Sequence, residues 1–348
     1  MKNNSDRVVY KDWLKILATC AVIMLHVASK NMWAYQVDEK NFQIYTIYSC
    51  LTRWAVPVFF MVSGSHLLDP KQEVTSKKLY SYKIRLIKSF IIWSLIYTAW
   101  NIFYQIKFNN TMLDSVSIFK MIYEGPYHFW FIFVMLGLYI ITPYLRKVIQ
   151  FSTVKEVKTL LTVWILFSIV QPIFIKFNVG IFEVVRYWMG SFKLVGLTGY
   201  LGYFILGYYL SITRYKYQKG SVVAFVCSSI FMILFTFYLE RTLGSRDDFW
   251  QDNFSPLVLI QAITVFLMSK NSEKLLLGKK DWLEKLSKAS FGVYLCHDLI
   301  LSILFQVVGF DTMRFNPLWS IPVISGCIAM VGFCLSIIWR SVCQLKRN

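Results

Sequence analysis

The sequence predicts an all-α integral membrane protein of about ten transmembrane helices, with both termini in the cytoplasm. Of its 348 residues, 56% are hydrophobic and only 16% are charged, which is too apolar for a soluble chain of this length. Apolar runs of about twenty residues recur along the whole chain, and this is the length that crosses a bilayer as a helix. Lys and Arg gather in alternate loops, as the positive-inside rule expects.

Ten spans can be marked in the hydrophobic pattern. Their ranges are roughly 12–32, 44–68, 84–106, 127–148, 157–177, 194–213, 221–240, 253–270, 286–310 and 317–342. The loops and ends on one side carry 23 Lys and Arg residues, and the five loops on the other side carry 10. The richer side is therefore predicted to be cytoplasmic. No soluble segment of domain size is attached, so residues 1–348 are expected to form a single transmembrane domain.

Two connecting segments have helical patterns of their own. Residues 106–126 include the amphipathic piece SVSIFKMIYEG, which predicts a short interfacial helix or part of a lid on the extracytoplasmic side. Residues 271–285 predict an interfacial helix on the cytoplasmic side.

The formal charge of +18 suggests nucleic acid only if the protein were soluble. The basic residues are scattered over many short loops instead of forming one patch, so no nucleic-acid partner is predicted. The predicted partners of these residues are membrane lipids. None of the seven cysteines forms a CxxC pair, so neither a disulfide framework nor a metal site is predicted. HExxH and GxSxG motifs are also missing from the sequence, which leaves zinc hydrolysis and the serine-elbow mechanism without support.

The first span carries two ionisable residues, Lys15 and His26. Eleven residues are close to three helical turns, so both side chains lie on one face, roughly 16 Å apart along the axis. Ionisable residues inside a membrane helix are costly and are candidates for function. The alternatives are that Lys15 reaches the headgroups and that His26 is satisfied by a neighbouring helix.

The second span contains Arg53 in its outer half, at about the depth of His26. An unpaired arginine there would be costly, so Arg53 is expected to face a polar cavity or an anion. Pro57 is expected to kink the helix. Ser63 and Gly64 are expected to allow another helix to approach closely.

Arg85 and Lys88 open the third span and are neighbours on one face. Two cations at the cytoplasmic boundary suit a ligand with phosphate groups, although plain topological anchoring explains them as well. His128 opens the fourth span beside aromatic residues. An aromatic belt explains its neighbours better than it explains the histidine.

The ninth span places Ser290, Tyr294 and His297 at i, i+4 and i+7, on one helical face. His297 is predicted to lie at mid-membrane. A structural polar contact between helices is the alternative to a functional role.

Together these motifs resemble the membrane acyltransferase-3 family over nearly the whole chain. The basic residue, ten residues and histidine of its first helix match Lys15 and His26, and its Arg-x-x-Arg matches Arg85 and Lys88. The remaining family motifs are matched by Phe59, Phe60, Ser63 and Gly64; by His128, Trp130, Phe131, Leu138, Tyr139, Thr142 and Pro143; and by Ser290, Gly292, Val293, Tyr294 and His297. Lysine replaces arginine at positions 15 and 88, which keeps the charge but loses a bidentate clamp.

The stretch around Arg53 and Pro57 resembles the branch that contains the enterobacterial common antigen O-acetyltransferase. The resemblance implies a multi-pass protein of the bacterial inner (plasma) membrane. It implies transfer of an acyl group, commonly acetyl, from cytoplasmic acyl-CoA to a hydroxyl of a cell-surface glycan or its lipid-linked precursor. Acetyl-CoA would be a donor substrate, and no bound cofactor is expected.

The implied roles follow the motifs. Arg85 and Lys88 would hold the phosphates of CoA, with Lys15 along the path of the thioester. His26 would act as general base or carry the acyl group itself. Arg53 and His128 would face the acceptor or stabilise the thioester oxygen, and Tyr294 and His297 would line the same cavity. The competing hypothesis is an exporter or transporter of a surface polysaccharide without acyl transfer.

Overall fold

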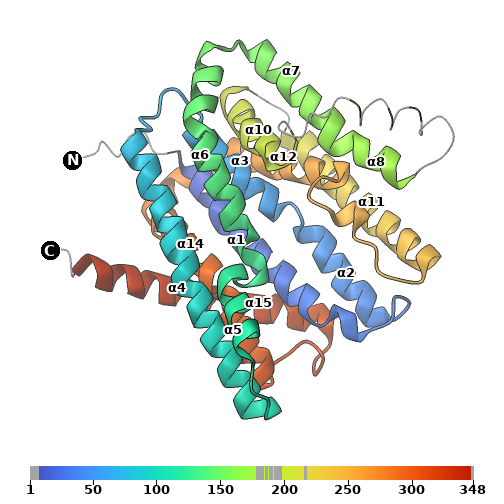
Figure 1. Cartoon of the computed structure of the whole chain (residues 1–348). Helices are drawn as coiled ribbons and strands as arrows, with labels where there is room; N and C mark the ends of the chain where they lie inside the picture. Colours follow the sequence, from blue (N-terminus) through green and yellow to red (C-terminus); the bar gives the residue numbers. More distant parts are fainter. Residues whose placement is uncertain are drawn as a thin grey trace. The chain divides into compact units, whose positions relative to one another are not determined.

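The computed structural model describes residues 8–177, 184, 187, 191, 198–214 and 218–345. The regular elements of these residues are all helical (Figure 1). The helices form two compact units. Unit 1 comprises Met1–His66 and Val154–Asn348, and unit 2 comprises Leu67–Thr153.

Unit 1 is built around α1 (Val9–Lys30), which packs against α14 (Lys280–Ile303) and α15 (Pro317–Leu345). Its other α-helices are α2 (Lys40–Thr52), α3 (Ala55–Leu67), α7 (Val154–Trp164), α8 (Gln171–Lys176), α10 (Tyr200–Ile212), α11 (Gln218–Leu243), α12 (Pro256–Asn271) and α13 (Glu273–Leu276). The core between α1, α14 and α15 is aliphatic, with Ile23, Val293 and Ile324 almost fully buried.

Unit 2 consists of the 34-residue helix α4 (Ser76–Asn109), the short α5 (Ser115–Glu124) and α6 (Trp130–Phe151). These helices are coloured from cyan to green in Figure 1. The Asp114 carboxylate caps α5 by accepting from the Ser117 backbone N–H at 3.3 Å. A hydrogen bond from the Ser117 side chain, together with this backbone contact, lowers the pKa of Asp114. The predicted amphipathic helix between residues 106 and 126 is therefore confirmed as a helix.

Nine helices in the described part of the chain are long and apolar enough to cross a membrane. The all-α polytopic fold is thereby confirmed. The sixth predicted span, 194–213, corresponds to α10, which is 13 residues long. Residues 194–197 of that prediction lie outside the described residues.

Two predicted elements are interrupted. The second span is not one helix, because α2 ends at Thr52 and α3 begins at Ala55. Pro57 has no N–H to donate to the Arg53 carbonyl four residues earlier, which accounts for a break at this place. The predicted interfacial helix at 271–285 is wrong as a single element, since α14 begins at Lys280 and continues into the span.

Helices α3 and α10 approach to backbone contact. A Cβ added at Gly64 would lie 1.8 Å from the Phe204 carbonyl oxygen, and one at Gly207 would lie 1.9 Å from the Met61 carbonyl oxygen. Only glycine fits at either position. The packing role predicted for Gly64 is confirmed.

Candidate active site

The beginning of α1 is fixed by an acidic cap from another helix. The Glu273 carboxylate accepts hydrogen bonds from the backbone N–H groups of Val9, at 2.8 Å, and Tyr10, at 2.5 Å. A negative charge is favourable at a helix N-terminus, where backbone N–H groups have no partner within the helix. The cap sets the position of α1, and with it the positions of Lys15 and His26.

Two polar contacts join α1 to α14. Near the start of both helices, the Ser287 hydroxyl donates to the buried Asp12 carboxylate at 2.5 Å. Farther along, the rings of His26 and His297 lie with centroids 5.1 Å apart and planes inclined at 35°. Since the later contact involves the later residue of each helix, α1 and α14 run in the same direction.

His297 is held from its own helix. Its Nδ1 lies 2.7 Å from the Tyr294 carbonyl oxygen, and its ring stacks with the Tyr294 ring at 6.1 Å. A carbonyl oxygen only accepts, so Nδ1 carries the proton and Nε2 is the basic nitrogen of the neutral ring. His297 is 1% exposed, whereas His26 is partly exposed. The pair thus joins a buried, oriented imidazole to one that is partly exposed.

Gly292 lets α14 lie directly on α15. A Cβ at Gly292 would meet the Ser336 hydroxyl at 2.2 Å, and that hydroxyl donates to the Ala289 carbonyl at 2.8 Å. The glycine of the Ser290-to-His297 motif therefore has a packing role, two residues before Tyr294.

Arg53 lies at the break between α2 and α3, where it is tied to the loop that precedes α12. Its Nε and Nη2 donate to the Gln251 side-chain oxygen at 3.2 and 3.1 Å, and Nη2 lies 3.5 Å from the Asp248 carboxylate. Ser49 donates to the same Gln251 oxygen at 2.6 Å. The expectation that Arg53 faces an anion is met by Asp248, a residue of the chain itself.

Residues Gln251, Asp248 and Glu240 were not among the sequence candidates. Gln251 is 1% exposed, and Glu240, near the end of α11, is equally buried. Neither oxygen of the Glu240 carboxylate has a hydrogen-bond partner among the described residues. An acidic residue in the apolar run 221–240 was the available sequence signal for Glu240. The polar loop residue Gln251 gave none.

The other candidates belong to unit 2. Arg85 and Lys88 are exposed on the surface of α4. His128 is 3% exposed in the single helical turn before α6, where its ring meets the Tyr97 ring edge-on at 5.7 Å. Tyr97 lies nine residues after Lys88 on α4, roughly 14 Å along the axis. The basic pair and the contact with His128 therefore lie at separate levels of α4.

Arg146 has a structural role that the sequence did not predict. Its guanidinium donates to the carbonyl oxygens of Leu67 at 2.6 Å, Asp69 at 3.0 Å and Gln72 at 2.8 Å. It fixes the loop that leads to α4. The described residues contain no group of three or more His, Cys, Asp or Glu side chains that could hold a metal ion.

A family model described as an acyltransferase domain matches residues 8–339. The chain belongs to the acyltransferase-3 family. The match extends through both units and includes every candidate residue named above. A comparison with curated proteins and another with solved structures gave no match. The protein is thus a multi-pass membrane acyltransferase, and its assignment to the branch of the enterobacterial common antigen enzyme stays a prediction.

Proposed function

We propose that this protein is an O-acyltransferase of the bacterial inner membrane. It transfers an acyl group, most simply acetyl, from cytoplasmic acyl-CoA to a hydroxyl of a cell-surface glycan or its lipid-linked precursor. The observation that carries the proposal is the contact of His26 with His297 between α1 and α14. It places two imidazoles together in a chain of an acyltransferase family.

The chemistry needs a base that can both take and return a proton. In the direct route, the acceptor oxygen bonds to the thioester carbonyl carbon while the carbon–sulfur bond breaks. The hydroxyl proton passes to His26 and then to the CoA thiolate, so the products are an ester and free CoA thiol. In the two-step route, a ring nitrogen of His26 bonds to the thioester carbonyl carbon while the carbon–sulfur bond breaks, and CoA leaves as the thiol with the imidazole proton. The acceptor hydroxyl then attacks the acyl-imidazole, the carbon–nitrogen bond breaks, and the hydroxyl proton returns to the His26 ring.

His297 is a positioning residue in both routes. Its ring is fixed by the Tyr294 carbonyl and lies against His26, which limits the orientations that His26 can adopt. Arg53 and His128 would stabilise the negative charge that develops on the thioester oxygen or contact the acceptor. Tyr294 would line the same site.

The donor would be held by charge. CoA carries several phosphate charges, and the exposed Arg85 and Lys88 are neighbours on one face of α4. Lys15 would meet the thioester arm on its way from the cytoplasmic side. No resident cofactor is needed, because acetyl-CoA is consumed as a substrate.

The proposal is tested by mass spectrometry of surface glycans from cells that produce each variant. His26→Ala should lower ester formation by about 10³-fold, since a positioned general base contributes 10²- to 10⁴-fold. His66→Ala is the matched control, because it removes a histidine outside the proposed site. Equal protein levels in the membrane fraction would show that both variants insert.

Retained ester in His26→Ala cells would overturn the proposal. Loss of glycan export without loss of an ester would favour the transporter hypothesis instead. Incubation with labelled acetyl-CoA followed by a rapid quench separates the two routes, because only the two-step route leaves label on the protein.

A further inference from the structure

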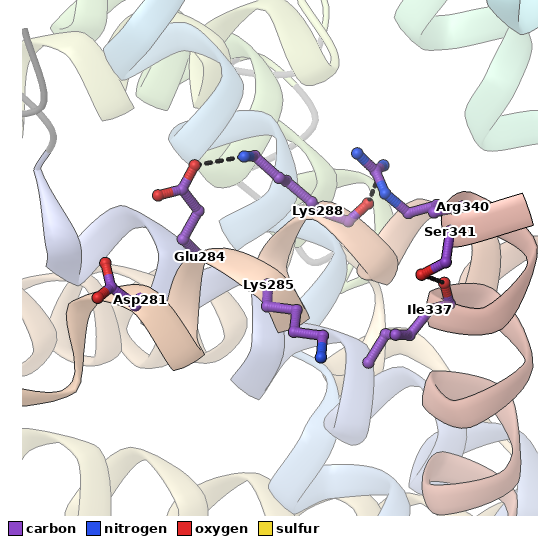
Figure 2. Close-up of a pocket in the computed structure, with 7 residues that line it drawn as sticks. All are labelled: Asp281, Glu284, Lys285, Lys288, Ile337, Arg340 and Ser341. Carbon is purple, nitrogen blue, oxygen red and sulfur yellow. Dashed lines mark hydrogen bonds and ion pairs between the residues drawn. The ribbon is translucent and has the colours of Figure 1, made fainter. Parts of the chain in front are cut away.

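A pocket of about 330 Å³ lies where α14 begins and α15 ends (Figure 2), and neither histidine of the pair lines it. It is entirely within unit 1. Its lining consists of Asp281, Glu284, Lys285, Lys288, Ile337, Arg340 and Ser341. Five of these seven side chains are charged, and they come from two helices that are packed together.

The charges are divided along α14. Asp281 and Glu284 come first, and Lys285 and Lys288 follow deeper along the helix (Figure 2). Arg340 adds a third cation from α15. A step of four residues, as from Asp281 to Lys285, is about 6 Å along the helix axis. The pocket is therefore acidic near the beginning of α14 and basic farther along this helix.

Internal contacts use only part of this charge. Lys288 pairs with Glu284, and Arg340 gives one Nη1 donor to the Lys288 carbonyl at 2.7 Å. In the described part of the chain, neither Lys285 nor Asp281 takes part in an ion pair. One cation and one anion thus remain available to a ligand, beside the unused donors of Arg340.

Helix α15 has an exposed apolar stripe before Arg340. Ile337 lines the pocket. Val331, Leu335 and Ile338 follow one another at i, i+4 and i+7 on the same helix, with 41%, 52% and 61% of their surface exposed. Side chains at this spacing form one stripe, which lies along α15 from Ile338 back toward the middle of the span.

We propose that this pocket binds a phospholipid whose zwitterionic headgroup ends in a primary ammonium group, as in phosphatidylethanolamine. The phosphate would contact Lys285 and Arg340, and the ammonium group would contact Asp281. The acyl chains would lie along the α15 stripe. This inference does not depend on the proposed acyl transfer.

The order of charges supports this class of lipid. In a phosphoethanolamine headgroup the phosphate is next to the glycerol and the acyl chains, while the ammonium group is two carbons farther out. Along the two helices the order is the same: the apolar stripe of α15, then Arg340 and Lys285, then Asp281. A soluble polyanion such as CoA would gain from the cations but would be repelled by Asp281, and it would leave the stripe unused.

The test is native mass spectrometry of delipidated protein mixed with dioleoyl phosphatidylethanolamine, phosphatidylcholine or phosphatidylglycerol. The wild-type protein should bind phosphatidylethanolamine about fivefold more tightly than the other two. Phosphatidylcholine has a cation that cannot donate a hydrogen bond to Asp281, and phosphatidylglycerol has no cation.

Two variants separate the two ends of the headgroup. Lys285→Gln should weaken the binding of all three lipids by about fivefold, because the lipid phosphate loses a partner. Asp281→Asn should remove the preference for phosphatidylethanolamine and strengthen the binding of phosphatidylglycerol. Among the described residues neither Lys285 nor Asp281 has an ion-pair partner, so both variants should keep the thermal unfolding midpoint of the wild type. Lys77→Gln removes an exposed lysine at the start of α4 and is the matched control.

Equal binding of the three lipids by the wild-type protein would overturn the proposal. So would unchanged lipid binding by Lys285→Gln. Displacement of phosphatidylethanolamine by inorganic phosphate or CoA would assign the pocket to a soluble phosphate instead, and would likewise overturn it.

Discussion

The spans that contain α1 and α4 carry similar residues in opposite surroundings. Each has basic residues near its beginning and a histidine contact farther along: Lys15 and His26 on α1, and Lys88 followed by Tyr97, which meets His128, on α4. Yet 61% of the most apolar part of the α1 span is buried, against 22% for the α4 span. The α1 span is therefore mostly enclosed between helices in unit 1, whereas α4 in unit 2 exposes its basic pair and buries its contact with His128.

This difference in burial suggests that the two units have different roles. Residues held between packed helices keep a fixed geometry, which bond-making steps require. Exposed cations on long side chains can adapt to a polyanion that arrives from solution, but they are held less precisely. We therefore expect substitutions between α1 and its neighbours to affect stability or the chemical step, and substitutions on α4 to affect binding of the donor.

The largest expected effect is on the close packing within unit 1. Gly64→Ala would place a methyl group against the Phe204 carbonyl, where α3 and α10 have no room to separate cheaply. We expect a loss of about 3 kcal/mol in unfolding free energy, the upper end for overpacking. Gly137→Ala on α6 is the control from unit 2, since a Cβ there meets nothing within 4 Å. Thermal and denaturant unfolding in nanodiscs would measure both.

A similar loss in both glycine variants would contradict the contrast between the units. It would mean that an added methyl group disturbs these helices wherever it is placed. A loss in Gly64→Ala alone, repeated by Gly207→Ala, would confirm that unit 1 depends on backbone contact between α3 and α10.

Much of unit 1 could be predicted from local pattern. The periodicity of Ser290, Tyr294 and His297 predicted their shared face, and the family resemblance implied that His297 lines the same cavity as His26. Their ring contact is now visible, while their chemical roles stay proposals. Hydrophobic pattern also located the spans, because burial in lipid needs only apolar composition and length.

What the sequence could not predict depends on distant residues. Arg53 meets Gln251 and Asp248 about two hundred positions later, and Glu273 caps a helix that begins at Val9. A single sequence contains no signal for such pairings, since any of several loops could supply a carboxylate or an amide. The sequence predicts a kink at Pro57, because proline can be recognised in a sequence. The structure has the break after Thr52, because the missing N–H of proline affects the preceding helical turn.

The intermediate effect concerns the exposed pair in unit 2. The double variant Arg85→Gln, Lys88→Gln should raise the KM for acetyl-CoA about tenfold and leave kcat within about twofold, because it removes ground-state binding of phosphate. The KM should also lose most of its dependence on salt. Steady-state release of CoA thiol at several ionic strengths would measure this. Lys71→Gln, Lys77→Gln is a control that removes two exposed charges nearby.

A fall in kcat at unchanged KM would break the comparison, since it would place the pair in the chemical step. An equal rise in KM for the control would show that the general positive charge of this region attracts the donor. Only a specific rise for the Arg85 and Lys88 variant supports a phosphate site.

The smallest expected effect concerns two cationic residues, one in each unit, that make the same kind of contact. Lys270 in unit 1 donates to the carbonyls of Leu210, Ser211 and Thr213 at 2.6–2.8 Å. Arg146 does the same for three carbonyls of the loop that begins at Leu67. Both cations hold backbone oxygens that a helix leaves without partners where it ends.

Lys270→Gln and Arg146→Gln should therefore each lower the unfolding free energy by about 1 kcal/mol, the net worth of a typical hydrogen bond lost to a shorter donor. Denaturant unfolding of both variants would measure the losses, and limited proteolysis of Arg146→Gln should cut between Leu67 and Gln72. Similar losses of unfolding free energy would show that both units stabilise their helix ends in the same way. The units would then differ only in how much of their spans is buried. A loss confined to Lys270→Gln would extend the contrast to the ends of the helices, because the loop in unit 2 would then not need its cation.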